Sequence, residues 1–243
     1  MGAERIRMVC LAHAGGTASD VYAPWKSRWA DIVEVIPLDL PGRGSRPPHP
    51  VSSVDALVSS LSKTVMEEVD GPWYVFGHSF GAGLALEITR FTEGLGRGPV
   101  GCLVSGRRPP AAGPPNGENG PRLSDDELLE RVSAWGGLPP EFLSHAGLRR
   151  MAVERLRLDI EFSDRLHRLH DRPPVAADLH VLSGRSDPLA RPEQALGWRG
   201  HGAGRVTFDD FEGDHFFVTT NAAVVPTITA RLTTPTTTSG ARR

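Results

Sequence analysis

A short β-like run leads directly into a glycine-flanked serine, and this junction limits the folds that the chain can adopt. The run is Trp73 to Phe76, and a G-x-S-x-G pentapeptide and a helical pattern follow it at Gly77 to Gly81 and beyond. Such a turn lifts the serine hydroxyl above the end of a sheet, and its glycines are required because a Cβ would collide with the neighbouring strand or helix. Ser79 is therefore the candidate nucleophile. In a chain with 27 glycines the pentapeptide alone is weak evidence, so other segments must supply the context.

Two later segments supply an acid and a base in the order that follows an elbow serine. Leu179 to Leu182 has the pattern of a strand, and the loop after it carries Asp187, where Pro188 blocks further strand pairing. Arg205 to Phe208 has the pattern of another strand, and His215 follows it on a loop. We therefore predict Asp187 as the orienting acid and His215 as the general base.

Other side chains compete for these two roles, since the chain holds 9 His and 29 acidic residues. Asp214 adjoins His215, but adjacent side chains tend to diverge, so Asp187 is the preferred partner. The other candidate histidines lie in a charged helical stretch or inside a strand, which favours structural or surface roles. They are His145, His167, His170 and His180.

The loop after the first predicted strand is suited to bind an oxyanion. The strand is Ile6 to Leu11, and it runs into a small-residue loop, Ala12 to Gly16, whose backbone can approach a substrate closely. An oxyanion hole combines the N–H after the nucleophile with one from such an early loop. We predict the backbone N–H groups of Ala14 and Phe80 as the donors, and His13 as a residue that braces the loop.

Short apolar runs alternate along the chain with helical patterns, which predicts an α/β fold with a mainly parallel sheet covered by helices on both faces. One covering helix is expected at Val54 to Val69, where apolar residues recur at i, i+3 and i+4 spacing. The turn from Asp39 to Gly44 is expected to be a structural connector in preference to a substrate contact. The six strands are expected near residues 6–11, 32–37, 73–76, 100–104, 179–183 and 205–211.

The interval at about 107–175 breaks this alternation. It opens with a Pro- and Gly-rich linker from Arg107 to Pro121, continues with a helix that starts at a capping box, Ser124 to Glu127, and ends with a long helical pattern from Leu148 to His170. Helices inserted after a strand of such a sheet are usually a lid, so we predict a helical lid insertion. A rigid cap that never moves is the alternative.

Length, composition and charge favour one intracellular domain. A chain of 243 residues with 39% hydrophobic content can fill a single core, which we place at residues 1–232. The net charge of −2 and the lack of a dense basic block argue against binding to nucleic acid. The first residues form no apolar signal segment and no run reaches transmembrane length, so we expect no membrane contact and a cytoplasmic location. The Thr-, Ser- and Arg-rich stretch 233–243 is expected to be a disordered tail.

The two cysteines, Cys10 and Cys102, both fall in predicted buried strands. We therefore expect reduced core residues, not a disulfide or a metal site. Neither a metal-ligand cluster nor a glycine-rich phosphate loop is recognisable, so the sequence predicts no cofactor and no metal.

Several segments together resemble the type II thioesterases, which are stand-alone α/β-hydrolases that serve polyketide synthases and nonribosomal peptide synthetases. The resemblance is collinear from about Arg7 to about Leu232. Two departures are small: Leu11-Ala12 stands where the family more often has Phe-Pro, and Phe80 where Met is common. The matching segments are 11–16, 39–44, 77–81, 104–108, 187–189 and 213–217.

This resemblance implies a serine hydrolase of the thioester-hydrolase class. Its substrates would be acyl groups on the phosphopantetheine arm of acyl or peptidyl carrier proteins, and its task the removal of stalled or aberrant chains. By resemblance, Ser79, Asp187 and His215 inherit the triad roles, and Ala14 and Phe80 the oxyanion donors. No cofactor is implied, and we expect a monomer.

Other functions stay open on the sequence: programmed release of a final product, acyl transfer to another acceptor, hydrolysis of small-molecule esters, or carrier binding without catalysis. We expect the substrate to arrive in trans, because no carrier domain is fused within these 243 residues. Arg107 and Arg108 follow the fourth predicted strand and could meet the arm's phosphate or an acidic carrier surface. A structural ion pair is an equal alternative for them.

Overall fold

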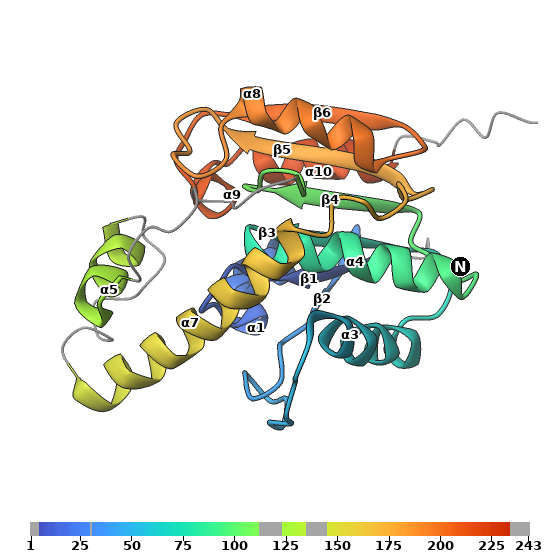
Figure 1. Ribbon diagram of the computed structural model, residues 1–243. Helices are drawn as coiled ribbons and strands as arrows, with labels where there is room; N and C mark the ends of the chain where they lie inside the picture. The colour runs from blue at the N-terminus through green and yellow to red at the C-terminus, as the bar shows by residue number, and fades with distance from the viewer. Residues whose placement is uncertain (1–4, 30, 112–122, 135–144, 234–243) are drawn as a thin grey trace, which may run out of the picture.

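A six-stranded sheet forms the centre of the protein, seen in a computed structural model that describes residues 5–29, 31–111, 123–134 and 145–233 (Figure 1). The strand order is β2-β1-β3-β4-β5-β6, and all five neighbouring pairs are parallel. All six strands lie where the sequence predicts them, so the predicted α/β architecture is confirmed. The strands are β1 (Ile6–Leu11), β2 (Val33–Pro37), β3 (Trp73–His78), β4 (Gly101–Ser105), β5 (Asp178–Gly184) and β6 (Val206–Phe211).

Helices cover both faces of this sheet (Figure 1). One face packs against α3 (Val54–Glu68), α4 (Phe80–Gly94), α8 (Pro192–Ala195) and the 3-10 helix η1 (Leu196–His201). The other face packs against α1 (Ala18–Val21), α2 (Ala23–Arg28), α9 (Phe217–Thr220) and α10 (Val224–Thr233). The helix predicted over 54–69 is therefore confirmed as α3, with Ser53 accepting a hydrogen bond from Ala56 N at its N-terminus.

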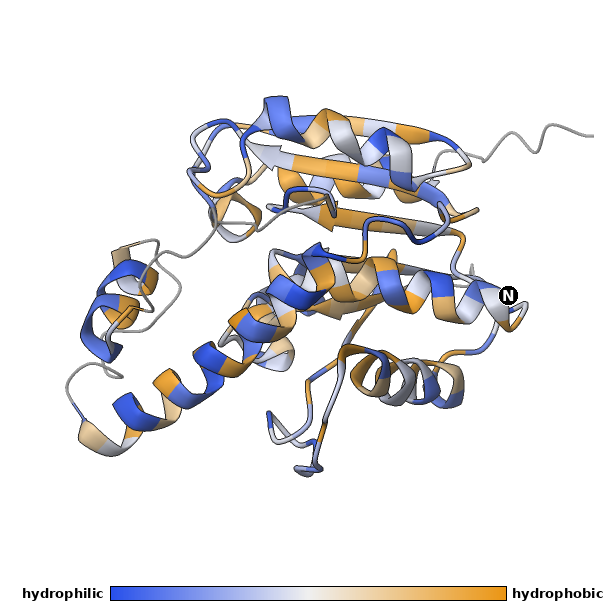
Figure 2. Cartoon of the chain, in the orientation of Figure 1, coloured by the Kyte–Doolittle hydropathy of each residue, from blue (hydrophilic) through white to orange (hydrophobic). Residues whose placement is uncertain are grey.

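The strands contribute alternate side chains to the two core layers, because successive residues of a strand point to opposite faces. Val9 and Leu11 of β1 pack with α3 and α4, whereas Met8 and Cys10 pack on the other face. Long hydrophobic stretches of the strands are visible in Figure 2, as for β4 and β5. Cys10 and the buried Cys102 lie on opposite faces and are free, and burial raises the pKa of Cys102 to about 12.

The predicted insertion contains two described helices, α5 (Asp125–Ala134) and α7 (Ala146–His167), which project from the sheet (Figure 1). The predicted capping box is confirmed, since Ser124 N and Oγ donate to Glu127 and Glu127 N donates back to Ser124 Oγ. The two helices share a small apolar cluster of their own, although α7 is otherwise largely hydrophilic (Figure 2). Residues 112–121 of the predicted linker lie outside the described residues.

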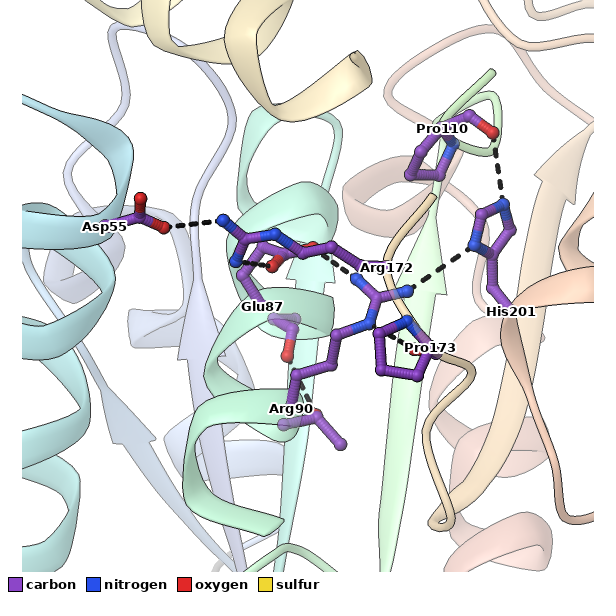
Figure 3. Close-up of polar contacts among 9 residues, drawn as sticks. Asp55, Glu87, Arg90, Pro110, Arg172, Pro173 and His201 are labelled. Atoms are coloured by element: carbon purple, nitrogen blue, oxygen red, sulfur yellow. Dashed lines mark hydrogen bonds and ion pairs between the residues drawn. The ribbon is translucent and has the colours of Figure 1, made fainter. Parts of the chain in front are cut away.

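A polar network holds the segment that follows the insertion against the helices beneath it (Figure 3). Glu87 of α4 is buried and pairs with Arg90 and with Arg172, whose Nη1 lies 2.8 Å from the carboxylate. Arg172 also reaches Asp55 of α3 at 2.7 Å, and Arg90 Nε donates to Pro173 O at 2.7 Å. The C-terminal root of the insertion is thereby fixed to α3 and α4.

The N-terminal root of the insertion is fixed in the same region (Figure 3). His201 Nε2 donates to Pro110 O at 3.1 Å, since a carbonyl can only accept, and its Nδ1 faces Arg90 Nη2 at 3.5 Å. Ala111 N donates to His167 O at 3.1 Å, which ties the first residues of the insertion to the end of α7. Both roots of the insertion are therefore anchored to the sheet and its helices.

The C-terminal helix runs one residue into the stretch that the sequence predicts as a tail, because α10 ends at Thr233. The rest of that predicted tail, 234–243, lies outside the described residues. Across the described part of the chain, the search for a helix with the length and hydropathy of a membrane span finds none.

Candidate active site

Ser79 occupies a strained turn between β3 and α4. Its backbone angles are φ 55° and ψ −113°. Among the residues that the structure describes, it is the one non-glycine residue with positive φ. A Cβ on Gly77 would lie 2.1 Å from Gly81 O, and a Cβ on Gly81 would lie 2.3 Å from Leu11 O. Both glycines are therefore required by close backbone approach, as the sequence predicts for this turn.

Asp187 and His215 come together from the loops that follow β5 and β6. His215 Nδ1 lies 2.8 Å from Asp187 Oδ2, and both side chains are buried. Asp187 Oδ1 accepts hydrogen bonds from Leu189 N at 2.8 Å and Ala190 N at 3.2 Å. The carboxylate is thus held at both oxygens, which leaves His215 Nδ1 as the donor and Nε2 as the basic nitrogen of the ring.

Asp214, the rival acid, has a different task. Its Oδ1 accepts from Phe216 N at 2.9 Å, a short-range contact within the loop before α9. The structure therefore places Asp187 against His215, in agreement with the predicted pairing.

One cavity of about 340 Å³ brings the predicted groups to a common surface. Ser79 and His215 line it together with Ala14 and Phe80, the predicted oxyanion donors. Phe80 is the first residue of α4, so its N–H has no acceptor within that helix. The apolar part of the wall is formed by Leu123, Leu128, Val132, Leu156, Ile160 and Leu189. The polar part is formed by Arg107, Arg108, Arg131, Ser163, Asp164 and His167.

His78 lies next to His215, and His13 lies beside His78 and Phe216. The buried His78 has its ring centroid 4.9 Å from that of His215, and His13 packs edge-on against Phe216 at 4.9 Å. Burial, and then the proximity of His215 and His13, holds the pKa of His78 well below its ordinary value. His78 therefore stays neutral beside His215. The ring contact of His13 with Phe216 joins the loop after β1 to the segment that follows His215, and the role of His13 in bracing the loop stays a prediction.

Arg107 faces inward. Its Nη1 donates to Ser163 Oγ at 2.8 Å and to Ser79 O at 3.4 Å, and its Nη2 donates to Ser163 O at 2.9 Å. Burial lowers the pKa of Arg107 to about 10. These contacts join α7 to the turn at Ser79, so Arg107 has a structural role and only Arg108 of the two arginines is a candidate for docking a partner. The structural role of Arg107 rests on hydrogen bonds and not on the ion pair that the sequence suggested.

Sequence reasoning assigned His167 a structural or surface role and missed its place in the cavity wall. The signal was available, because Leu156, Ile160, Ser163 and His167 follow the i, i+4, i+7, i+11 spacing of one helix face. Burial, followed by Arg107 and Arg108, lowers the pKa of His167 to about 4. The ring is therefore neutral at pH 7.

We expect acid to destabilise the fold through buried histidines. The pKa values of His167 and His180 are lowered from 6.5 to about 4, chiefly by burial. The unfolded chain then binds more protons than the folded one between these values, so the free energy of unfolding falls as the pH drops from 6.5 toward 4. Each such histidine adds at most about 1.4 kcal/mol per pH unit to the slope. Urea denaturation at pH 7, 6, 5 and 4 measures how the free energy of unfolding changes with pH.

A single substitution isolates one contribution to that slope. His180 Nδ1 lies 2.7 Å from Thr207 Oγ1, and His180→Asn keeps a polar group near this position while removing the titratable ring. The variant is expected to have a shallower acid slope, whereas His49→Gln, at an exposed site, is the control and should retain it. Identical slopes in His180→Asn and the wild type would contradict the assignment.

Comparison of the chain with known proteins finds similarity to thioesterases in both sequence and structure. A family model described as "Thioesterase domain" matches residues 7–232. The chain is 34% identical over 234 residues to the probable cadicidin biosynthesis thioesterase of Streptomyces griseus; the alignment covers 96% of this chain but 64% of that relative's length.

Solved structures of similar size also match. RedJ, a thioesterase from the prodiginine biosynthetic pathway of Streptomyces coelicolor, shares 30% identity at a TM-score of 0.80, with 96% of this chain and 93% of RedJ covered. BorB, a type II thioesterase from the borrelidin biosynthetic cluster, shares 30% identity at a TM-score of 0.78, with 95% and 94% covered. The predicted α/β-hydrolase fold class is confirmed by these neighbours.

Proposed function

The chain belongs to the thioesterase domain family, and from that premise we propose that it is a type II thioesterase that hydrolyses acyl thioesters on the phosphopantetheine arm of carrier proteins. Its context would be polyketide or nonribosomal peptide synthesis, where it clears stalled or aberrant chains. The observation that supports this most directly is the cavity shared by Ser79 and His215, with Asp187 bonded to the far side of the imidazole. We further propose a cytoplasmic monomer that meets its carrier in trans.

The proposed chemistry begins with proton transfer from Ser79 Oγ to His215 Nε2 as Oγ attacks the thioester carbonyl. The N–H groups of Ala14 and Phe80 bind the oxyanion of the tetrahedral intermediate, and Asp187 holds His215 in the required tautomer. Collapse of the intermediate breaks the C–S bond, and the leaving sulfur takes the proton from His215; because the thiol pKa is about 8.5, its departure needs little acid assistance. Water then attacks the acyl-Ser79 ester while His215, neutral again, takes its proton. Collapse of this second intermediate breaks the C–O bond to Ser79, Oγ takes the proton back from His215, and the free acid leaves.

The cavity wall suits an acyl chain. Leu128 and Val132 of α5 face Leu156 and Ile160 of α7 around the same space. Ligand pockets combine such apolar lining with a few placed polar groups. The apolar part would shelter the acyl group, while Arg108 and Arg131 of the polar part lie where an anionic arm or carrier could approach.

The expected substrate preference is a higher kcat/KM for an acyl-carrier thioester than for the same acyl group on a short free thiol. The reaction at Ser79 is identical for both, so a difference reports remote binding energy that is used at the reacting centre. Charge reversal at Arg108 and Arg131, as Arg108→Glu with Arg131→Glu, should lower the carrier value by about tenfold because steering of an anionic partner is lost. Steady-state kinetics and intact-mass analysis of the acyl-loaded carrier give both values.

The control for this test is Lys26→Glu with Arg28→Glu, an equal charge change at two exposed positions of α2. It should leave both substrates unaffected. Equal kcat/KM values for the carrier and the free thiol, unchanged by reversal at Arg108 and Arg131, would contradict carrier recognition and favour a small-molecule esterase. A product that appears only when an alcohol or amine acceptor is added would indicate an acyltransferase.

A further inference from the structure

A buried ion pair joins the insertion to the turn after β2. Arg43 Nη2 lies 2.6 Å from Asp159 Oδ1, and the two side chains are only 5% and 3% exposed. Arg43 belongs to the Asp39–Gly44 turn, and Asp159 lies in the middle of α7, 116 residues away in sequence. The pair thus connects the turn to a helix that lines the cavity, but neither member of the pair lines it.

Both members of this pair also hold the loop that follows β1. Gly15 N donates to Asp159 Oδ2 at 2.6 Å, and Arg43 Nη1 donates to Gly16 O at 3.0 Å. Each oxygen of the Asp159 carboxylate therefore has its own donor, one from a side chain and one from the backbone. The two bonds hold the loop at Gly15 and Gly16, the residues directly after Ala14.

The same loop is packed closely by the helix that carries Asp159. Gly15 has a φ of 81°, and a Cβ at this position would lie 2.8 Å from Leu156 Cδ2. Ala14 packs against the apolar cluster that α5 and α7 share. Apart from His13 the loop consists of small residues, so the position of Ala14 to Gly16 depends on these outside contacts more than on side chains of their own.

The contact at Gly15 has a direct geometric consequence for Ala14. The Gly15 N–H belongs to the peptide unit that follows Ala14 Cα, so its bond to Asp159 holds that peptide plane and restrains ψ of Ala14. The Ala14 N–H shares a peptide unit with His13 C=O, which accepts from Gly16 N at 3.0 Å, and Gly16 O in turn accepts from Arg43, so the orientation of the Ala14 N–H depends on the same anchored residues. A buried ion pair is weak evidence for stability, and its best-supported advantage over apolar packing is that it specifies one arrangement.

Helix α7 reaches the second proposed oxyanion donor as well. Ser163 holds Arg107, whose Nη1 donates to Ser79 O at 3.4 Å. Ser79 C=O and Phe80 N–H are parts of one peptide unit, so this contact bears on the orientation of the Phe80 N–H. The peptides beside both donors are therefore held from one helix.

We propose that Asp159 is a positioning residue for the oxyanion hole: its carboxylate, oriented by Arg43, holds the Gly15 N–H from α7 and so aims the Ala14 N–H at the oxyanion. This inference rests on the proposed function for the role of Ala14. It makes the inserted helix a part of the catalytic geometry in addition to a wall of the cavity. Asp159 touches no reacting atom and acts through the backbone of the loop.

The test is Asp159→Asn, which keeps the shape of the side chain but loses the charge that orients Arg43. We expect kcat to fall about 10- to 100-fold while KM changes less than about threefold, because the loss is felt only where charge develops in the transition state. The second-order rate of Ser79 labelling by a fluorophosphonate should fall in parallel, since its phosphoryl oxygen occupies the same hole. Asp159→Glu, which restores the charge, should recover part of both rates.

A double variant separates positioning from folding. Arg43→Met with Asp159→Leu replaces the pair by apolar side chains, so no charge is left buried alone, and the fold is expected to persist. It should melt near the wild-type temperature and still show the low kcat and slow labelling. Asp209→Asn is the control for the same chemical change elsewhere, because Asp209 forms a doubly bonded but more exposed pair with Arg231 between β6 and α10, at 2.6 Å and 2.9 Å, away from the cavity.

Wild-type kcat and labelling in the folded double variant would overturn the proposal, since the pair would then serve stability alone. A rise in KM with kcat unchanged in Asp159→Asn would also overturn it, because it would assign Asp159 to substrate binding. The labelling assay contains no thioester. A wild-type protein that labels at Ser79 but hydrolyses no carrier thioester would therefore contradict the proposed function and leave the positioning test intact.

Discussion

Ser79→Ala is expected to lower kcat for thioester hydrolysis by on the order of a million-fold, with the fold retained. The hydroxyl provides the attacking oxygen, and the described residues give it no hydrogen bond on which the turn depends. The strained backbone at φ 55° is maintained by Gly77, Gly81 and the bond from Ser79 N to Ser105 O at 2.8 Å, all of which survive the substitution. Steady-state kinetics, thermal melting and stoichiometric fluorophosphonate labelling measure the three consequences.

The control for that experiment is Ser186→Ala. Ser186 is exposed on the loop that carries Asp187 and would be the next candidate nucleophile by position. It should retain both hydrolysis and labelling. A Ser79→Ala protein that kept more than about a thousandth of the wild-type kcat would contradict the nucleophile assignment, because residual catalysis without a triad serine is much lower.

The sheet and the turn at Ser79 could be predicted because their signals are local. Each strand is a short apolar run with partners on both faces, and the Gly-x-Ser-x-Gly spacing records the close approach of Gly77 to Gly81 and of Gly81 to Leu11. The proximity of Asp187 and His215 could be predicted because loops that follow parallel strands meet at one edge of the sheet. In both cases a short sequence pattern is enough to predict where the residues lie in the fold.

The supporting contacts of the candidate site could not be predicted from the same patterns. Asp159 lies among the Arg and Glu residues of α7, and nothing in its neighbourhood distinguishes a buried carboxylate from a solvated one. Its partner Arg43 stands in a turn whose glycines suggest only a connector. The sequence left a docking role and a structural role open for both Arg107 and Arg108, because two adjacent arginines do not reveal which of them turns inward to Ser163. These contacts depend on how α7 packs against α3 and α4, which is a property of the tertiary structure.

Asp187→Asn is expected to lower kcat by on the order of ten-thousand-fold through the wrong imidazole tautomer. Asp187 Oδ1 accepts from Leu189 N and Ala190 N, so the amide oxygen of the asparagine should keep that place and turn its NH₂ toward His215. An NH₂ group cannot accept the Nδ1 proton. The proton then resides on Nε2, and the ring can no longer take one from Ser79.

Asp214→Asn provides the matched comparison, because it makes the same chemical change one residue from His215. Its Oδ1 accepts from Phe216 N, a bond that an asparagine oxygen can also make, so kcat should fall by less than about tenfold. Kinetics of both variants, with melting curves to show that each is folded, give the ranking. If Asp214→Asn were the more damaging change, Asp214 would be the acid that acts on His215. The bond of 2.8 Å between His215 and Asp187 would then belong to a resting arrangement that the reaction does not use.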